Sequence, residues 1–137
     1  MIFESLEQKR KELGTLSLAL IDPDTKNNQK ITPMIKKVND SGFDAILVGG
    51  SKILDNQFEQ RLKTIKENTD LPIILFPGDS SQISSYADAI LFLSLLSGRN
   101  PKYLIEEQVK ASNKIYDTEL EVIPTGYLLF ATESKTT

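Results

Sequence analysis

Two carboxylates, Asp22 and Asp24, directly follow an apolar run that begins at Leu16. Pro23 lies between them and lacks the N–H that a strand ladder needs, so a strand is expected to end here. Carboxylate oxygens at the tip of a strand suit a hard cation such as Mg²⁺, which usually shares its coordination with a substrate phosphate. The alternative is that both residues only terminate the strand and cap a turn.

A second candidate group is Gly49-Gly50-Ser51, which follows an apolar run at 43–48. Bare glycine backbone allows close approach of a phosphate, and the Ser51 hydroxyl is a suitable ligand for Mg²⁺. A tight turn between a strand and a helix is the alternative. Gly78 follows the next apolar run, where its backbone amide would either face a ligand or simply form a turn.

Two further residues are candidates because of their neighbours. Arg99 precedes Asn100-Pro101, which predicts a helix N-terminus, so its guanidinium could bind an anion there or lie on the surface. Glu121 belongs to the last predicted strand and points either into the mouth of a barrel as a functional carboxylate or outward into solvent.

Composition excludes several kinds of chemistry. The chain has 137 residues, a net charge of −3 and no Cys, Trp or His. Histidine-ligated zinc, a Ser-His-Asp triad and a cysteine nucleophile are therefore excluded, and a general base must be Asp, Glu, Tyr or Lys. The acidic balance argues against nucleic-acid binding. No stretch predicts a transmembrane segment or a signal peptide, so a cytoplasmic location is expected.

Apolar runs indicate five strands, at 16–21, 43–48, 72–76, 87–93 and 120–123. The first run is almost continuously apolar, which predicts a strand buried on both faces. An amphipathic helix is expected before Gly14, and Pro124 is expected to break the fifth strand. Repeated βα units predict one α/β domain, residues 1–137, with a parallel sheet whose strand order follows the sequence.

The number of βα units predicts an incomplete barrel. Only about ten residues, 77–86, separate the third and fourth strands, so the third helix is expected to be short or missing. A complete (β/α)₈ TIM barrel usually needs about 250 residues, so this chain would supply about the first five of eight units. Its two open edge strands would favour a homo-oligomer or poor solubility.

Several motifs, in order and spacing, resemble one family, the geranylgeranylglyceryl phosphate synthases, which includes the heptaprenylglyceryl phosphate synthases. The resemblance covers nearly all of residues 15–130, and a poor third helix is also a family trait. The motifs are Ile21-Asp22-Pro23-Asp24, Val48-Gly49-Gly50-Ser51, Ile74-Leu75-Phe76-Pro77-Gly78, Ala87-Asp88-Ala89-Ile90-Leu91-Phe92, Arg99-Asn100-Pro101 and Ile123-Pro124-Thr125-Gly126-Tyr127.

The resemblance implies a TIM-barrel prenyltransferase that joins a polyprenyl diphosphate, such as geranylgeranyl diphosphate, to sn-glycerol 1-phosphate and releases pyrophosphate with Mg²⁺. By motif position, Asp22 and Ser51 match the metal ligands. The residue two before Asp22 is Leu20, where some members have lysine. The glycerol-phosphate site is expected beyond Thr137, and no catalytic base is assigned.

The remaining expectations concern substrate contacts and rival functions. The candidate substrate-binding residues are Gly49, Gly50, Gly78, Arg99 and Tyr127, and the candidates for lining a prenyl tail are Phe76, Phe92, Leu95, Leu96 and Tyr127. One alternative is a different phosphate-binding TIM-barrel enzyme. Another is a non-catalytic or truncated half-barrel.

Overall fold

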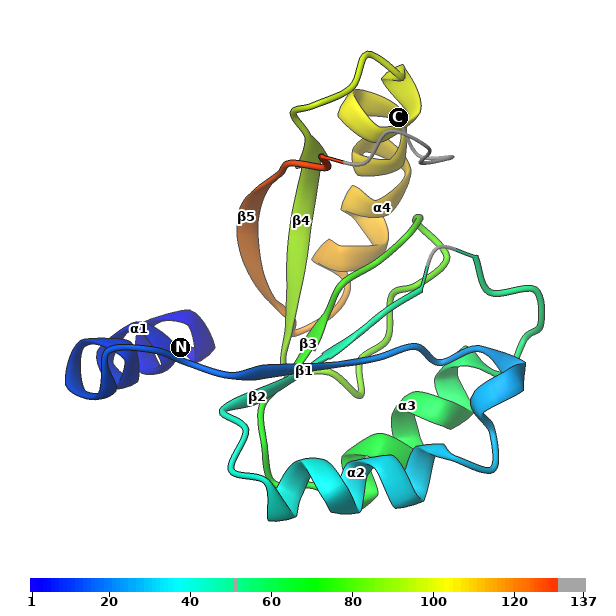
Figure 1. Cartoon of the computed structure of the whole chain (residues 1–137). Coiled ribbons are helices and arrows are strands. Elements are labelled where there is room, and N and C mark those ends of the chain that lie inside the picture. Colours follow the sequence, from blue (N-terminus) through cyan, green and yellow to red (C-terminus); the bar gives the residue numbers. More distant parts are fainter. Residues whose placement is uncertain (51, 131–137) are drawn as a thin grey trace.

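The computed structural model describes residues 1–50 and 52–130. Five strands form one parallel sheet in the order β1-β2-β3-β4-β5 (Figure 1). The predicted strand order and parallel pairing are confirmed. The strands are β1 (Leu18–Ile21), β2 (Ala45–Val48), β3 (Ile73–Leu75), β4 (Ala89–Leu95) and β5 (Glu121–Tyr127).

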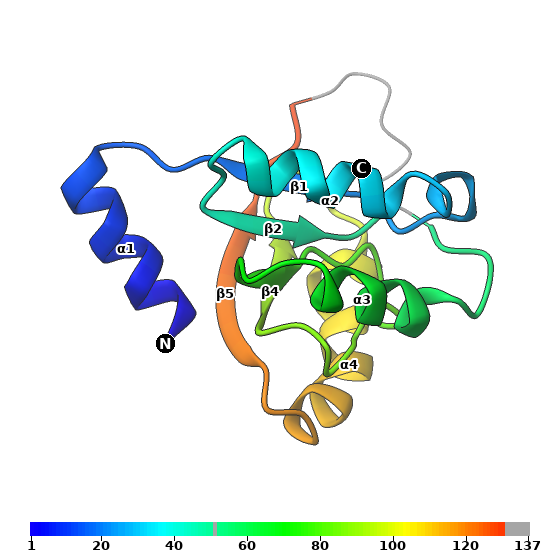
Figure 2. The same cartoon turned by 90° about the horizontal axis from the view of Figure 1, so that it is seen from below.

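The helices differ in how they relate to this sheet. Three of them, α2, α3 and α4, contribute buried residues to the main hydrophobic core, whereas α1 lies apart from them in both Figure 1 and Figure 2. A short turn of π-helix, Lys102–Glu106, leads into α4. The helices are α1 (Ile2–Leu13), α2 (Ile31–Asp40), α3 (Phe58–Glu67) and α4 (Glu107–Tyr116). No helix in the described part of the chain is long and apolar enough to cross a membrane.

The main core lies between the sheet and these three helices. Ile35 of α2, Leu62 and Ile65 of α3, and Ile46 and Ile73 of the sheet are all fully buried there. Each helix presents an apolar stripe at helical spacing, and burial of such side chains contributes about 1.5–3 kcal/mol each. This layer holds the C-terminal ends of the strands in fixed register.

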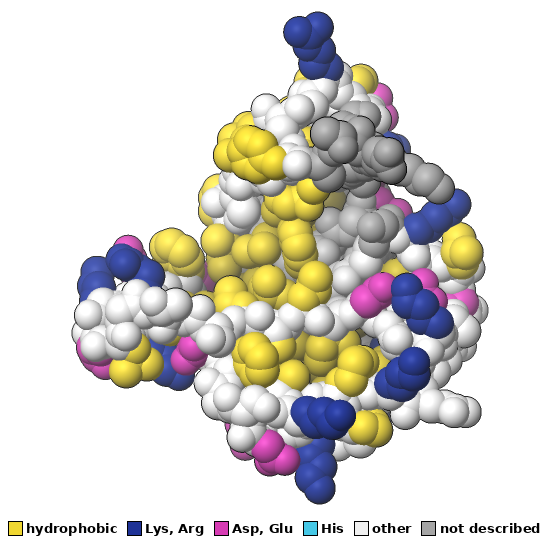
Figure 3. All heavy atoms as spheres, in the orientation of Figure 1, with side chains coloured by type: hydrophobic (Ala, Val, Ile, Leu, Met, Phe, Trp, Pro, Cys, Tyr) yellow, Lys and Arg dark blue, Asp and Glu magenta, His cyan; other side chains and the backbone are white. Residues whose placement is uncertain are grey.

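The opposite face of the sheet, here called the inner face, is covered only in part. Ala45, Ile74 and Ala89 form a small buried cluster there, and Ile2 and Leu6 of α1 pack against it. Figure 3 shows hydrophobic side chains gathered over the middle of the sheet, in the orientation of Figure 1.

The prediction that the first strand is buried on both faces is wrong. Ala19 and Ile21 join the main core, but Leu18 and Leu20 remain 42% and 57% exposed. Side chains alternate between the two faces of a strand, so these two leucines point away from the main core. Their register partners, Ala45 and Leu47, belong to the inner face, which is covered only in part.

The prediction that Pro124 breaks the fifth strand is also wrong. β5 runs without interruption from Glu121 to Tyr127, and Pro124 pairs in register with Phe92. The N–H of Glu121 and the carbonyl of Tyr127 both point toward β4. Alternation along the strand therefore turns the nitrogen of Pro124 toward the open edge, where no ladder hydrogen bond is lost.

The connection between β3 and β4 contains no helix, as the short spacing predicted. Residues 77–88 instead form turns, and three consecutive side chains within them are almost fully buried: Gln82, Ile83 and Ser84. Ile83 joins the main core, and the Ser84 hydroxyl donates to Glu59 of α3 at 2.8 Å. A buried irregular segment thus stands where a regular βα unit has a helix.

Candidate functional site

The C-terminal ends of β1, β2 and β3 meet at one edge of the sheet, here called the rim. Asp22 follows β1 directly, Gly49 and Gly50 follow β2, and Gly78 comes shortly after β3. An ideal Cβ built on Gly50 would lie only 2.4 Å from Oδ1 of Asp22. The Asp22 carboxylate therefore lies directly over Gly50, and only glycine leaves room for it.

The two oxygens of Asp22 have different surroundings. Oδ2 lies 3.3 Å from Nζ of Lys26, and the side chain as a whole is 37% exposed. Oδ1 is buried and has no hydrogen-bond partner among the described residues. A buried polar atom without a partner costs about 1–3 kcal/mol, so this oxygen is suited to a ligand that the folded chain does not supply.

Asp24 has a different local role. Its carboxylate accepts a hydrogen bond from the backbone N–H of Lys26 at 3.0 Å and caps a short 3₁₀ turn, Thr25–Asn27. The turn-capping alternative thus describes Asp24. Asp22 is held by its backbone instead, because Nδ2 of Asn27 donates to its carbonyl oxygen at 2.9 Å.

Gln82 organises the glycine backbone of the rim and was not singled out from the sequence. Its Oε1 accepts hydrogen bonds from the N–H groups of Gly50 and Gly78, both at 3.2 Å, and its Nε2 donates to the Gly50 carbonyl at 2.6 Å. The side chain is 1% exposed. Both N–H groups already donate to Gln82, so they are not free to donate to a ligand. Gly50 and Gly78 can only leave room for one, because they have no side chain.

Gly49 is required for a different reason. An ideal Cβ on this residue would lie 1.7 Å from the carbonyl oxygen of Phe76. The backbone after β3 cannot move aside cheaply, because the Phe76 N–H donates to the Val48 carbonyl at 2.8 Å. Gly49 thus keeps the ends of β2 and β3 in close contact.

A pocket of about 380 Å³ opens beside the rim and extends between β4 and α4. Gly49, Gly50, Gly78 and Tyr127 line it, and the rings of Phe76 and Tyr127 meet edge to face with their centroids 5.6 Å apart. Its walls are otherwise mostly apolar. The apolar lining residues are Leu20, Phe76, Pro77, Ile83, Ile90, Leu91, Phe92, Leu93, Leu95, Ala111, Ile115 and Leu129.

Polar side chains of α4 and the preceding turn lie at the wall of this pocket. Nε2 of Gln108 donates to the Leu93 and Tyr103 carbonyls, at 2.6 and 3.0 Å. Glu107 accepts from the Ser80 N–H at 2.6 Å. Burial opposes ionisation of Glu107, but hydrogen bonding by the backbone and side chain of Ser80, together with the nearby charges of Lys110 and Lys102, leaves its pKa lowered overall, so Glu107 is ionised at neutral pH.

Three sequence candidates lie elsewhere or outside the described residues. Arg99 is exposed in the turn before α4 and does not line the pocket. Ser51 lies outside the described residues, so its predicted role as a metal ligand stays a prediction. Among the apolar candidates, Leu96 is 61% exposed and lies outside the pocket lining.

The structure corrects the hypothesis about Glu121. This carboxylate lies at the start of β5, at the end of the sheet away from the rim, and accepts hydrogen bonds from the N–H groups of Ile2 and Phe3. Negative charge at a helix N-terminus is stabilising, so Glu121 caps α1. It points neither into the mouth of a barrel nor freely into solvent.

Arg61 of α3 forms a second polar cluster behind the rim. Its guanidinium holds Asp55 through two contacts, 2.8 and 2.6 Å long, and its side chain is 5% exposed. Hydrogen bonds from Arg61, with a further one from Thr25, keep the pKa of Asp55 well below its usual range. Asp55 is therefore negatively charged and Arg61 positively charged at neutral and mildly acidic pH.

A magnesium site at Asp22 fits what the described residues show. Residues 1–50 and 52–130 contain no group of three or more acidic, His or Cys side chains arranged to hold a metal. Mg²⁺ does not require such a group, because it is usually bound by one or two carboxylates together with water and substrate phosphates. The unpartnered Oδ1 of Asp22, which lies over the pocket-lining Gly50, suits that mode.

Comparison with known proteins identifies relatives over nearly the whole chain. Geranylgeranylglyceryl phosphate synthase of Flavobacterium johnsoniae is 44% identical over 135 residues, which are 98% of this chain and 56% of that protein. The protein of the same name from Zunongwangia profunda is 44% identical over 128 residues, covering 93% of this chain and 54% of that protein. The chain thus spans about half the length of the curated relatives it matches.

Solved structures give the same result. Wild-type GGGPS from Thermoplasma volcanium superposes with a TM-score of 0.82 at 39% identity, covering 93% of this chain and 52% of that one. A second structure is (S)-3-O-geranylgeranylglyceryl phosphate synthase from Thermoplasma acidophilum in complex with sn-glycerol-1-phosphate. It has a TM-score of 0.83 at 37% identity and covers 90% of this chain and 51% of that one. The five-stranded sheet is therefore part of a TIM-barrel type of fold.

A protein-family model also matches this chain. The model described as "PcrB family" matches residues 7–137, which include the whole rim and every residue that lines the pocket. The expected relationship to the geranylgeranylglyceryl phosphate synthases is confirmed by these relatives and structures. The chain belongs to the PcrB family.

Proposed function

We propose that this chain forms part of a Mg²⁺-dependent prenyltransferase that joins a polyprenyl diphosphate, geranylgeranyl in the first instance, to sn-glycerol 1-phosphate. One observation supports this most directly. The Asp22 carboxylate, with one buried oxygen free of any described partner, lies over Gly50, and Gly50 in turn lines a mostly apolar pocket. A polyprenyl diphosphate has a charged diphosphate end and an apolar tail. It therefore needs a metal-binding carboxylate and an apolar pocket next to each other.

On this proposal the rim receives the diphosphate. Asp22 and, by motif position, Ser51 hold Mg²⁺, which when bound neutralises negative charge on the leaving group. Gly50 leaves the space above it for the carboxylate and the phosphate oxygens, and Gln82 fixes the glycine backbone. The amides that Gln82 occupies are not assigned to phosphate binding.

The pocket receives the start of the prenyl tail. Phe76, Phe92, Leu95 and Tyr127 line it, together with the inner-face leucines of β4. Removing apolar surface from water is favourable by about 25 cal/mol per Å², so a long prenyl chain is bound without any directional contact. Phe76 and Tyr127 stand where the polar rim meets this apolar wall.

The reaction on this proposal is a displacement at the first carbon of the prenyl chain. The 3-hydroxyl oxygen of glycerol 1-phosphate forms a bond to that carbon, the bond from the carbon to the diphosphate oxygen breaks, and pyrophosphate leaves with the electron pair. The hydroxyl proton passes to a base that is expected in the half of the relatives that this chain does not span. The Thermoplasma acidophilum relative was solved with sn-glycerol-1-phosphate, which supports this choice of acceptor.

The 137-residue chain alone is expected to bind the diphosphate side and not to turn over. Orienting the acceptor hydroxyl supplies about 7–11 kcal/mol of barrier reduction, and the acceptor site is assigned to the half of the relatives that this chain does not span. The exposed edges of β1 and β5 are expected to make the isolated chain self-associate.

The test uses two proteins. One is the 137-residue chain, and the other is a chimera that joins residues 1–130 to the remaining part of the Flavobacterium johnsoniae relative. With Mg²⁺, geranylgeranyl diphosphate and glycerol 1-phosphate, ether product is expected from the chimera only. Multiple turnovers by the short chain would contradict the assignment of the acceptor site. A folded chimera without ether product would contradict the proposed function.

A further inference from the structure

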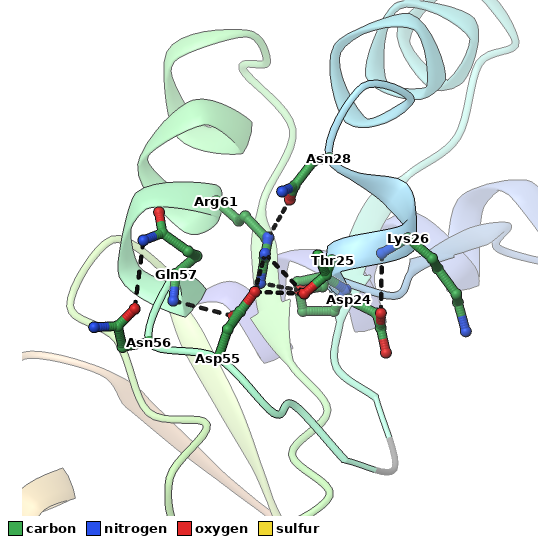
Figure 4. Close-up of polar contacts among 9 residues, drawn as sticks. Asp24, Thr25, Lys26, Asn28, Asp55, Asn56, Gln57 and Arg61 are labelled. Carbon is green, nitrogen blue, oxygen red and sulfur yellow. Dashed lines mark hydrogen bonds and ion pairs between the residues drawn. The ribbon is translucent and has the colours of Figure 1, made fainter.

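Arg61 is the most deeply buried cationic side chain that the structure describes, at 5% exposure, and it lies in the first turn of α3. Burying a guanidinium is costly, and a buried ion pair is by itself weak evidence of stabilisation. What distinguishes Arg61 is the direction of its contacts. They join two segments, residues 22–28 after β1 and residues 52–57 after β2 (Figure 4).

Arg61 contacts the first segment at two points, one of them the backbone next to Asp22. Nη1 of Arg61 donates to the carbonyl oxygen of Pro23 at 2.9 Å, and Nε donates to Oδ1 of Asn28 at 2.5 Å. The peptide unit between Pro23 and Asp24, the next but one along the chain from Asp22 itself, is therefore held in place by Arg61. The Asp22 carbonyl is fixed separately by Asn27.

The contact to the second segment is the bidentate pair with Asp55. The same carboxylate accepts from the N–H of Gln57 at 3.1 Å and from the Thr25 hydroxyl, so it is itself held in one orientation. A guanidinium presents its donors in a rigid plane that matches a carboxylate, which an ammonium group cannot do. The pair thus sets the spacing of the two segments that flank the rim.

We propose that Arg61 is a positioning residue for metal–diphosphate binding, which acts by fixing Pro23 and Asp55 so that the Asp22 carboxylate stays over Gly50. This inference rests on the proposed function, because it assigns Arg61 a role in placing the proposed metal ligand. Arg61 itself touches neither metal nor substrate.

The test measures binding of Mn²⁺, as a paramagnetic substitute for Mg²⁺, to the 137-residue chain with inorganic pyrophosphate. Arg61→Lys retains the charge but cannot reach Pro23, Asn28 and Asp55 together. Loss of a residue that orients a metal ligand typically weakens metal affinity ~10–100-fold, and a shift of that size in the dissociation constant is expected. Thermal unfolding of each variant is recorded in parallel.

Lys66→Met is the matched control. Lys66 lies on the same helix and pairs with Asp88 at 2.7 Å, but Asp88 precedes β4 at the end of the sheet away from the rim. This variant removes an ion pair of α3 without touching the rim. Its Mn²⁺ affinity is expected to equal that of the wild type even if its unfolding temperature falls.

The outcomes separate the two levels of the proposal. If wild type binds Mn²⁺–pyrophosphate and Arg61→Lys binds it equally well, Arg61 is structural only and the inference is overturned. If wild type does not bind, the metal assignment of the proposed function fails and the inference fails with it. If Arg61→Lys does not fold, Asn28→Ala decides: this exposed residue accepts only one of the contacts, and a smaller loss in the same direction is required.

Discussion

The two sides of the candidate site, the rim at β1–β3 and the pocket wall at β4–β5, are built on different principles. On the β1–β3 side, buried polar groups fix each backbone turn: Gln82 holds Gly50 and Gly78, and Arg61 holds Pro23 and Asp55. On the β4–β5 side, half-buried apolar side chains line an open volume. Electrostatic interactions depend steeply on distance and direction, whereas apolar burial depends on area. A site for a charged group therefore needs fixed geometry, and a site for an apolar tail needs only volume.

This comparison predicts its largest effect at Asp22. In the chimera, Asp22→Asn is expected to lower turnover by roughly 10²–10³, the usual cost of losing one preorganised electrostatic contact. Asp24→Asn is the matched control two residues away, because Asp24 caps a turn and asparagine caps about as well as aspartate, so turnover is expected to stay near that of the wild type. Steady-state turnover checks both. Near-wild-type turnover in Asp22→Asn would remove that residue from the site.

Glycine substitutions on the two sides sharpen the comparison. A Cβ on Gly50 would lie 2.4 Å from the Asp22 carboxylate, and a Cβ on Gly126 would lie 2.7 Å from the tip of the Leu96 side chain. Gly50→Ala is expected to displace Asp22 and weaken Mn²⁺ binding ~10-fold or more, as for a disturbed metal ligand. Gly126→Ala is expected to leave it unchanged, because Leu96 is exposed and can turn aside. Equal effects would contradict the distinction between the two sides.

Ser51→Ala is expected to cost less than Asp22→Asn, because a hydroxyl is a neutral ligand that water can replace. The prediction rests on motif position alone. A loss of turnover in the chimera of about tenfold is expected, partly recovered at high Mg²⁺ concentration. A loss as large as that of Asp22→Asn would assign Ser51 a further role.

On the apolar side a different kind of effect is expected. Leu93 lines the pocket from β4 and is only half buried. Leu93→Ala removes apolar area worth about 1–2 kcal/mol, so the KM for the prenyl diphosphate should rise roughly five- to thirtyfold. The affinity for Mn²⁺–pyrophosphate should not change, because pyrophosphate has no tail. If Leu93→Ala weakened Mn²⁺–pyrophosphate binding as much as it raised the KM, the rim and the pocket wall would not be independent.

The last prediction concerns stability rather than binding and is made for Asp55. Arg61 holds the folded-state pKa of this carboxyl below its unfolded value of about 4, so its contribution to stability is fully present above that pH. The contribution is lost as the pH falls from about 4 through the lower folded value. In urea unfolding, Asp55→Asn is expected to be less stable than wild type at pH 7, with the difference shrinking toward pH 2. A difference that grows in acid would contradict this assignment.

The sequence predicted those parts of the fold that depend on apolar periodicity and strand ends. Strand order, the helix-less connection at 77–88 and the convergence of Asp22 with Gly50 all follow from where apolar runs stop. It did not predict the one-sided burial of Leu18 and Leu20, because a run of apolar letters does not say which face is covered. Pro124 was misjudged because its effect depends on which edge its nitrogen faces.

The buried polar residues were harder to predict, although one carried a signal. Arg61 occupies the apolar face of α3 between Phe58, Leu62 and Ile65, at spacings of three, one and three residues. A charged residue in such a stripe indicates a buried ion pair or a functional contact. Gln82 carried no comparable signal, because its burial follows from how an irregular segment folds back on the rim.

The capping of α1 has a consequence for synthesis on the ribosome. Its N-terminal amides are held by Glu121, 119 residues further along the chain, whereas Lys9 near its other end pairs with Asp44 at 2.6 Å. At 5–20 residues per second, the partner of the first turn is made roughly 6–24 seconds after that turn. A free helix of this length is marginal in water, and α1 has no fully buried residue of its own. α1 is thus made before its capping partner and is fixed only after β5 has formed.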